Sequence, residues 1–174
     1  MLDWQAVGLT VGVIMLISMA YAAVSGAPWV PTRRKDIDRI LRLADPKAGE
    51  IMYDLGCGDG RIIVRAAREC GVFGVGIELS LLQALVAKVR SWRSGSNVHI
   101  RWTNVFRTDL RNADVVYLFL MPEAYAKIRP KLEAELKSGA RVLSYVWPIP
   151  GWVPTTVDDR EGAAKLYLYV REEK

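Results

Sequence analysis

The stretch MYDLGCGDGR, residues 52–61, constrains the fold more than any other feature of the chain. An apolar run ends in Asp54, and Gly56, Gly58 and Gly60 follow at every second position. Glycine has no Cβ, so such a turn can be tight and can bring its backbone close to a ligand. Ligands of doubly wound α/β sheets bind at the carboxyl ends of the strands. The stretch therefore predicts a ligand site at the end of a first strand.

The rest of the chain alternates between strand-like and helix-like segments. Strands are expected at residues 50–55, 71–79, 97–102, 113–120 and 140–147, and helices at 33–44, 60–70, 81–93 (capped by Ser80) and 122–137. This alternation favours a parallel sheet with helices on both faces. Segments 155–159 and 164–172 are expected to form a hairpin that adds an antiparallel edge. The predicted fold class is α/β: a Rossmann-like, doubly wound, mostly parallel sheet with a C-terminal antiparallel strand.

An uncharged segment precedes this domain. No residue from Trp4 to Thr32 is charged, and residues 6–25 are mostly apolar. A helix of that length can span the ~30 Å hydrocarbon layer of a bilayer. Trp4 at one end, with Tyr21 and Trp29 at the other, would suit the two membrane interfaces. We therefore predict one transmembrane helix.

The basic residues after this segment predict its orientation. Residues 33–35 read Arg-Arg-Lys, which places the following domain on the cytoplasmic side of a single-pass membrane protein. The expected division is an anchor and short linker over residues 1–28, and a folded domain over residues 29–174. Gly8 and Gly12 form a G-x-x-x-G pair that can support a homodimer.

Composition narrows the function classes. The 174 residues suffice for one domain of ordinary size, and the net charge of +5 comes from basic residues that are scattered rather than gathered in a stripe, so no nucleic-acid partner is expected. Cys57 and Cys70 show no disulfide or metal-binding pattern. The one histidine, His99, lies in a strand-like run, which disfavours a histidine-based metal site or triad. No metal is expected.

The acids around the glycine turn indicate the ligand. The G-x-G-x-G spacing differs from the dinucleotide fingerprint, and no phosphate-loop lysine follows it. Asp54 and Asp59 would repel a pyrophosphate but suit a cationic amino-acid group. Glu78 ends the second strand, where an acid can accept hydrogen bonds from ribose hydroxyls. Together these features predict a site for S-adenosylmethionine.

The motifs also carry a family resemblance. The segments YDLGCGDGR, VGIELS and WTNVF resemble the three cofactor motifs of class I methyltransferases. The segments WVPTRRKDIDRIL and YLFLMPEAYAKIRPKLEAELKSGARVLSY, with the following PGW, are similar to a group of small protein-lysine methyltransferases. That group contains archaeal enzymes and the mitochondrial enzymes that methylate ATP synthase c subunits and adenine nucleotide translocases. The resemblance covers about residues 29–171, so the domain over residues 29–174 is expected to be a class I methyltransferase domain.

The resemblance implies S-adenosylmethionine as cofactor and S-adenosylhomocysteine as product. It places residues 30–32 over the cofactor, Asp54 with the glycine turn at its methionine end, Glu78 at its ribose, and residues 104–105 at its adenine. The cofactor-binding residues expected are Pro31, Thr32, Asp54, Leu55, Gly56, Cys57, Gly58, Asp59, Gly60, Glu78, Leu79, Asn104, Val105 and Phe119.

Methyl transfer to lysine requires a neutral amine, which a desolvating apolar pocket favours, and aromatic faces can hold the cationic product. The candidate substrate-pocket residues lie at the carboxyl ends of the fourth and fifth predicted strands and are Phe119, Tyr145, Trp147 and Trp152. Glu123 is placed to act as a base, although an acid in the first turn of a helix commonly faces solvent.

The predicted function is an N-methyltransferase held at the membrane that methylates lysines of a membrane-associated protein. The seven-residue linker 26–32 reaches at most ~25 Å, which favours a substrate at the bilayer. A lipid headgroup or a small lipophilic molecule is the alternative substrate. The sequence leaves open the substrate, the number of methyl groups transferred and the oligomeric state.

Overall fold

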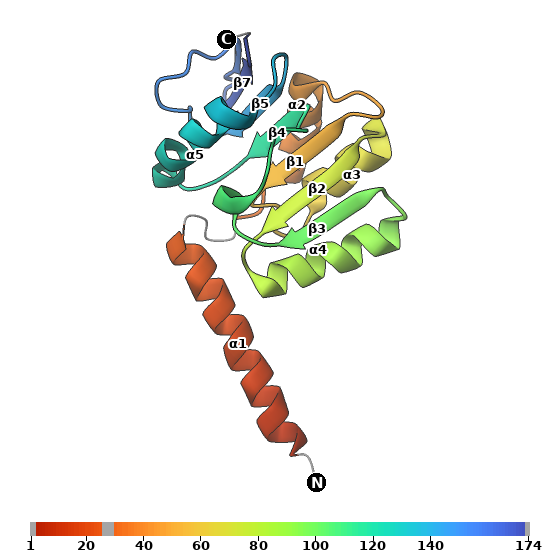
Figure 1. Cartoon of the computed structure of the whole chain (residues 1–174). Coiled ribbons are helices and arrows are strands. Elements are labelled where there is room, and N and C mark those ends of the chain that lie inside the picture. The colour runs from red at the N-terminus through yellow and green to blue at the C-terminus, as the bar shows by residue number, and fades with distance from the viewer. Residues whose placement is uncertain (1–2, 26–29, 173–174) are drawn as a thin grey trace.

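The computed structural model describes residues 3–25 and 30–172, which contain one seven-stranded sheet (Figure 1). The strand order is β3-β2-β1-β4-β5-β7-β6. The first five strands run parallel, and β7 is antiparallel to both β5 and β6. The strands are β1 (Ile51–Leu55), β2 (Phe73–Glu78), β3 (Val98–Trp102), β4 (Val115–Leu118), β5 (Arg141–Tyr145), β6 (Thr156–Asp158) and β7 (Leu166–Val170). The predicted Rossmann-like sheet with its C-terminal antiparallel hairpin is confirmed.

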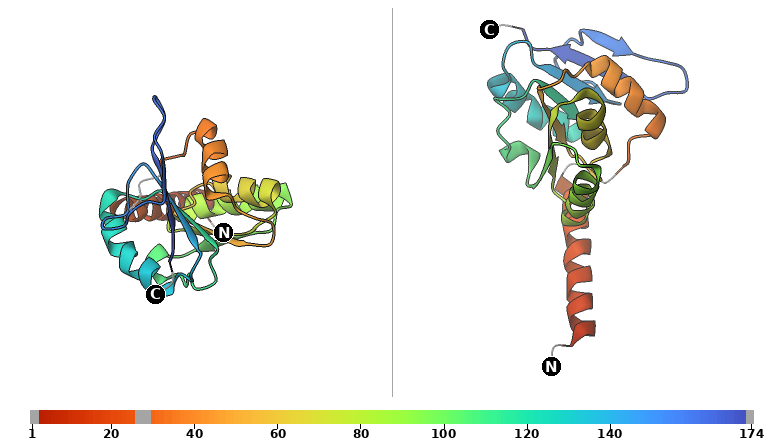
Figure 2. Two further views of the ribbon diagram at one scale, coloured as in Figure 1. Left: turned by 90° about the horizontal axis from the view of Figure 1, so that it is seen from above. Right: turned by 90° about the vertical axis from the view of Figure 1, so that its right-hand side faces the viewer.

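Helices cover both faces of this sheet (Figure 2). They are α2 (Arg34–Ala44), α3 (Arg61–Cys70), α4 (Leu81–Ser94) and α5 (Pro122–Glu135), with the short 3-10 helix η1 (Val105–Arg107). α2, α3 and α4 lie on one face and α5 on the other (Figure 2). A separate apolar core fills each side, as expected for a doubly wound sheet.

Local sequence patterns explain these elements. In α2 the residues Ile37, Ile40, Leu41 and Ala44 are buried, which is the spacing of one face of an α-helix. All four residues of β4 are buried, because a central parallel strand is covered on both faces. For this reason the sequence segments that predicted buried strands do not alternate strictly between apolar and polar residues.

The N-terminal helix α1 (Trp4–Ser25) projects away from the sheet (Figure 1). It meets the domain at α4, where the backbone N–H of Leu81 donates to the Ser18 hydroxyl at 2.7 Å. No helix within residues 3–25 and 30–172 combines the length and the apolar character needed to cross a membrane. The predictions of a transmembrane helix and of a single-pass membrane location are therefore wrong. Part of the segment assigned to the bilayer instead packs on α4 and presents a polar hydroxyl to its first turn.

Two predictions about the N-terminal region are not decided by the structure. Around Gly8 and Gly12 no other described segment comes within 4 Å of the position that a Cβ would take, so the homodimer stays a prediction. The boundary between residues 1–28 and 29–174 also stays a prediction, and Trp29 lies outside the described residues.

Candidate functional site

The glycine turn leaves the carboxyl end of β1 between β2 and β4. The N–H groups of Gly56 and Cys57 both donate to the carbonyl of Ile77 at 2.9 Å. Gly56, Gly58 and Gly60 have φ values of +85°, +54° and +74°, in the left-handed region that side chains disfavour. A Cβ on Gly56 would also lie 3.0 Å from the Leu120 side chain. The turn therefore requires glycine for its conformation and for its close packing.

Glu78, at the end of β2, is held against this turn. Its Oε2 accepts from the N–H of Gly58 at 2.8 Å, and its Oε1 accepts from the N–H groups of Leu79 and Ser80 at 2.9 and 2.8 Å. Ser80 stands at the N-cap of α4 as predicted, but its hydroxyl makes no capping bond there. The carboxylate is therefore fixed in position at the edge where a bound ribose is expected.

Asp54 is the unusual group of the site. It is buried, and neither carboxylate oxygen has a hydrogen-bond partner within the described chain. Burial, with the nearby negative charges of Glu78 and Asp59, raises the pKa of Asp54 well above its usual value. A buried polar group without a partner is costly, and a cationic amino group would satisfy it. The site therefore fits the methionine amino group of S-adenosylmethionine.

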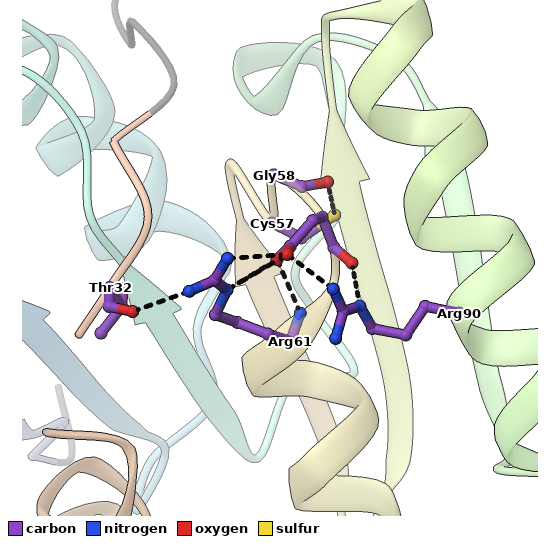
Figure 3. Close-up of polar contacts among 6 residues, drawn as sticks. Thr32, Cys57, Gly58, Arg61 and Arg90 are labelled. Atoms are coloured by element: carbon purple, nitrogen blue, oxygen red, sulfur yellow. Dashed lines mark hydrogen bonds and ion pairs between the residues drawn. The ribbon is translucent and has the colours of Figure 1, made fainter. Parts of the chain in front are cut away.

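Asp59 uses its carboxylate differently (Figure 3). It accepts from Arg61 Nη2 at 2.8 Å and from Arg90 Nη2 at 2.7 Å. Burial alone would raise the pKa of Asp59, but the hydrogen bond and charge of Arg61, with the charge of Arg90, outweigh it and lower that pKa. Arg61 Nη1 also donates to the carbonyl of Thr32 at 3.2 Å. Asp59 and its arginines thus tie the turn to α4 and to the segment before α2.

That segment, residues 30–33, lies beside the turn and β4. The Thr32 hydroxyl is 3.1 Å from the buried hydroxyl of Tyr117, which stands opposite Asp54 in the pairing of β4 with β1. Sequence reasoning did not single out Arg61, Arg90 or Tyr117. The position of Arg61 directly after the turn was a local signal, whereas Arg90 and Tyr117 reach the site only through the fold.

The predicted adenine side lies after β3. Asn104 Oδ1 accepts from the N–H of Phe106 at 2.9 Å and so caps η1. Val105 is the first residue of η1 and packs partly buried against the core. Leu79 accepts a hydrogen bond from the indole N–H of Trp102 at 2.9 Å. These residues gather at the ends of β2 and β3, next to Glu78.

Two of the four candidate substrate residues meet. The rings of Phe119 and Tyr145 pack edge to face with centroids 4.8 Å apart. The Tyr145 hydroxyl donates to Asp36 Oδ2 at 2.8 Å, and burial with this bond raises the pKa of Tyr145 to about 12. Both rings line a cavity of about 430 Å³ whose walls are Val30, Pro31, Arg33, Phe119, Tyr145, Val146, Gly162, Ala163 and Ala164.

Val146 gives one wall of this cavity an unusual backbone. Its φ of +74° is rare for a β-branched residue, and strain of this kind clusters at functional sites. A hydrogen bond from its N–H to the carbonyl of Lys165, at 2.8 Å, holds it in place.

The two tryptophans lie elsewhere. Trp147 is exposed and does not line the cavity. Trp152 is partly buried and packs against the core on the α5 side, where its indole N–H donates to Glu133 at 2.8 Å and its ring contacts Tyr169. Phe119 and Tyr145 line the cavity on the other side of the sheet, so the four aromatic residues do not form one cluster.

The sheet is doubly wound and has a glycine turn after β1. A buried carboxylate without a partner in the described residues precedes the turn, and a fixed acid ends β2. These features define a class I S-adenosylmethionine-dependent methyltransferase. The sequence model of the family described as the ANTKMT methyltransferase domain matches residues 54–156, and the chain belongs to this family. The predicted resemblance, cofactor and enzyme class are confirmed.

Known proteins agree on the class. The chain is 38% identical to a protein-lysine N-methyltransferase of Saccharolobus islandicus, covering 84% of this chain and 95% of that protein. It is 34% identical to the adenine nucleotide translocase lysine N-methyltransferase of Mus musculus over 82% of this chain, but spans only 62% of the mouse protein. A crystal structure titled as an RNA methyltransferase from Salinibacter ruber, in complex with S-adenosyl-L-homocysteine, superposes with a TM-score of 0.80 at 37% identity, covering 83% of this chain and 95% of that one.

Proposed function

We propose that this methyltransferase acts on lysine side chains of a protein. The observation that carries the proposal is the cavity beside the glycine turn. Its lining residue Phe119 belongs to the segment that packs on the turn, since a Cβ on Gly56 would lie 4.0 Å from the Phe119 carbonyl oxygen. The names of the relatives from Saccharolobus islandicus and Mus musculus support the same substrate class.

The lining of the cavity suits a neutral amine. Most of its lining side chains are apolar, Arg33 is the charged one among them, and none of them is acidic. The Tyr145 hydroxyl is already bonded to Asp36, which is paired in turn with Arg39 at 2.9 Å. A lysine amine that enters the cavity meets an apolar wall and the Arg33 guanidinium. Both lower the pKa of the amine and so favour its neutral, nucleophilic form. The aromatic faces of Phe119 and Tyr145 would hold the methylated cation.

The roles of the other residues follow from their positions. S-adenosylmethionine supplies an activated methyl group when bound, so the protein needs no electrophile of its own. Asp54 and the glycine turn would hold the methionine end, and Glu78 would accept the ribose hydroxyls. Residues 79, 104 and 105 would border the adenine. Residues 30–32 would cover the cofactor and separate it from bulk water. The same cover would help to keep the reacting atoms aligned.

The test compares substrate classes directly. Purified chain with methyl-labelled S-adenosylmethionine is incubated separately with the protein, RNA and lipid fractions of a cell extract. Label in protein, located on lysine by mass spectrometry and absent with Asp54→Asn, supports the proposal. Label in RNA alone would favour RNA as the substrate, as in the name of the Salinibacter ruber RNA methyltransferase. Label in lipid alone would favour a lipid headgroup amine as the substrate. Either result would overturn the lysine proposal.

A cavity-filling variant tests the site itself. Ala163→Trp places a large ring in the cavity wall, so we expect methyl transfer to fall while binding of S-adenosylhomocysteine is kept. Ala126→Trp, at an exposed position of α5, is the matched control and should keep both. Unchanged transfer by Ala163→Trp would remove the cavity from the mechanism.

A further inference from the structure

A second concave surface lies between α2, α3 and α4, on the face of the sheet that these three helices cover. It is a groove of about 670 Å³, and six of the residues that line it are arginines: Arg34, Arg61, Arg65, Arg68, Arg90 and Arg93. We call it the arginine groove. Nothing in the proposed lysine cavity uses it, since the two share no lining residue.

The charge of the arginine groove is not neutralised. Arg65 pairs with Asp38 and with Glu69, and Arg61 and Arg90 share Asp59. Arg34, Arg68 and Arg93 have no acidic partner within salt-bridge distance in the described part of the chain, and all three are exposed. The groove therefore keeps an excess of about three positive charges, which attracts an anionic partner.

The floor of the arginine groove is apolar. Ile37 and Val64 are buried at its base, while Val86 and Val89 on α4 are 41% and 54% exposed. No aromatic residue is among those that line it. Single-stranded nucleic acid is commonly bound by stacking its bases on aromatic rings, which this lining lacks. A protein segment that carries both carboxylates and aliphatic side chains matches the whole lining.

The arginine groove also reaches the cofactor side of the molecule. Arg61 and Arg90 belong to the groove and hold Asp59 of the glycine turn, and Arg61 contacts Thr32 (Figure 3). A segment bound in the groove is thus adjacent to the residues that border the cofactor. Holding a substrate at a second site raises its effective concentration at the first.

We propose that the arginine groove binds an acidic, partly aliphatic segment of the protein substrate, separate from the lysine that is methylated. This inference rests on the proposed function, because it takes the substrate to be a protein. The exposed arginines at the rim of the groove, which are Arg34, Arg68 and Arg93, would pair with carboxylates. Val86 and Val89 would contact the aliphatic side chains.

The test measures binding without catalysis. The full chain, saturated with S-adenosylhomocysteine, is titrated into a fluorescent peptide of glutamate and leucine at helical spacing, and into two comparison probes: the same peptide with glutamine for glutamate, and oligouridylate RNA. Anisotropy is read at low salt. We expect the acidic peptide to bind at least about tenfold more tightly than the glutamine peptide, because only its glutamate carboxylates can pair with the arginines of the groove.

Paired variants locate the binding. Arg68→Glu/Arg93→Glu should weaken the acidic peptide by at least about tenfold, since it replaces attraction with repulsion at two rim positions. Arg42→Glu/Lys127→Glu makes the same change in net charge at exposed positions outside the groove and should leave binding within about twofold. Both variants should bind S-adenosylhomocysteine as the parent does, which controls for folding.

Several outcomes would overturn the inference. These are no binding of the acidic peptide, an equal loss in both double variants, or tighter binding of RNA that Arg68→Glu/Arg93→Glu abolishes. The last result would make the groove a nucleic-acid surface. If lysine methylation is found but groove binding is not, this inference fails alone. If the peptide binds and no protein lysine is methylated, the proposed function fails.

Discussion

At the scale of single residues, Asp54 carries the most specific chemistry. Its two carboxylate oxygens are buried and have no hydrogen-bond partner within the described residues. Such a group destabilises the ligand-free fold, and it makes a favourable interaction only when a cation binds beside it. We therefore propose that cofactor recognition depends on Asp54, whose carboxylate has no hydrogen-bond partner within the described residues.

We expect Asp54→Asn to weaken S-adenosylhomocysteine binding by roughly 10- to 100-fold, the loss of a charged hydrogen bond worth about 1.5–3 kcal/mol. The free energy of unfolding without ligand should not fall at neutral pH, because the variant removes a buried unpaired charge. Calorimetry and urea unfolding measure the two effects. Asp109→Asn, at an exposed acid paired with Arg111, is the control. An unchanged affinity would place the amino group elsewhere.

The raised pKa of Asp54 also predicts a pH dependence. Below its unfolded pKa of about 3.9 the carboxyl is protonated in both the folded and the unfolded state, so its ionisation contributes nothing to the free energy of unfolding. As pH rises toward the folded pKa, the unfolded state ionises first, so the ligand-free fold loses stability relative to Asp54→Asn. The difference in unfolding free energy between the two proteins should therefore grow with pH and level off above the folded pKa. A difference that is constant across this window would contradict the burial effect.

At the scale of elements, the turn from β1 to α3 depends on contact with α4. Gly60 has a φ of +74°, and a Cβ there would lie 3.0 Å from the Cβ of Ala87. Gly95, after α4, has a φ of +62° but open space around it. A comparison of substitutions at Gly60 and Gly95 therefore distinguishes the cost of backbone strain from the cost of steric overpacking.

We expect Gly60→Ala to destabilise the fold by about 1 kcal/mol more than Gly95→Ala, since both incur backbone strain but only the first overpacks a contact. Adding Ala87→Gly to Gly60→Ala should recover part of that excess, which a double-mutant cycle in urea measures. Equal losses for the two alanine variants would mean that the α3–α4 contact relaxes without cost.

The structure brings only two of the four candidate substrate-pocket residues together. Phe119 and Tyr145 share one cavity because β4 and β5 are neighbours in the sheet. Trp152 follows β5 in the sequence but crosses to the α5 side, where Glu133 and Tyr169 hold it. Proximity in the sequence indicated a common cluster, and the path of the chain after β5 separated its members.

At the scale of the whole molecule, the described part of α1 meets the domain at α4. The Leu81 N–H donates a hydrogen bond to the Ser18 hydroxyl at this contact. That N–H lies in the first turn of α4, where water can replace the partner because the helix itself offers none. The boundary predicted from the sequence implies that residues 29–174 form an independent unit.

We expect a chain of residues 29–174 to fold and to bind S-adenosylhomocysteine within about twofold of the full chain, because α1 meets the described domain chiefly at α4, which carries none of the predicted cofactor residues. Circular dichroism and calorimetry check this. Failure of the shortened chain to fold, or a large loss of affinity, would show that α1 supports the site through α4.

The local features of this protein were determined by sequence alone. The order of strands and helices, the glycine turn and the acids at the ends of β1 and β2 follow from periodicity and from the conformations glycine allows, which are properties of adjacent residues. For the same reason the class of cofactor could be predicted before any distance was known. Tertiary structure decided how distant segments meet: Arg90 with Asp59, Tyr117 with Thr32, and the arginines of α2, α3 and α4 around one groove. It also overturned the membrane helix, because apolar composition describes a segment, whereas its surroundings depend on what the rest of the chain places beside it.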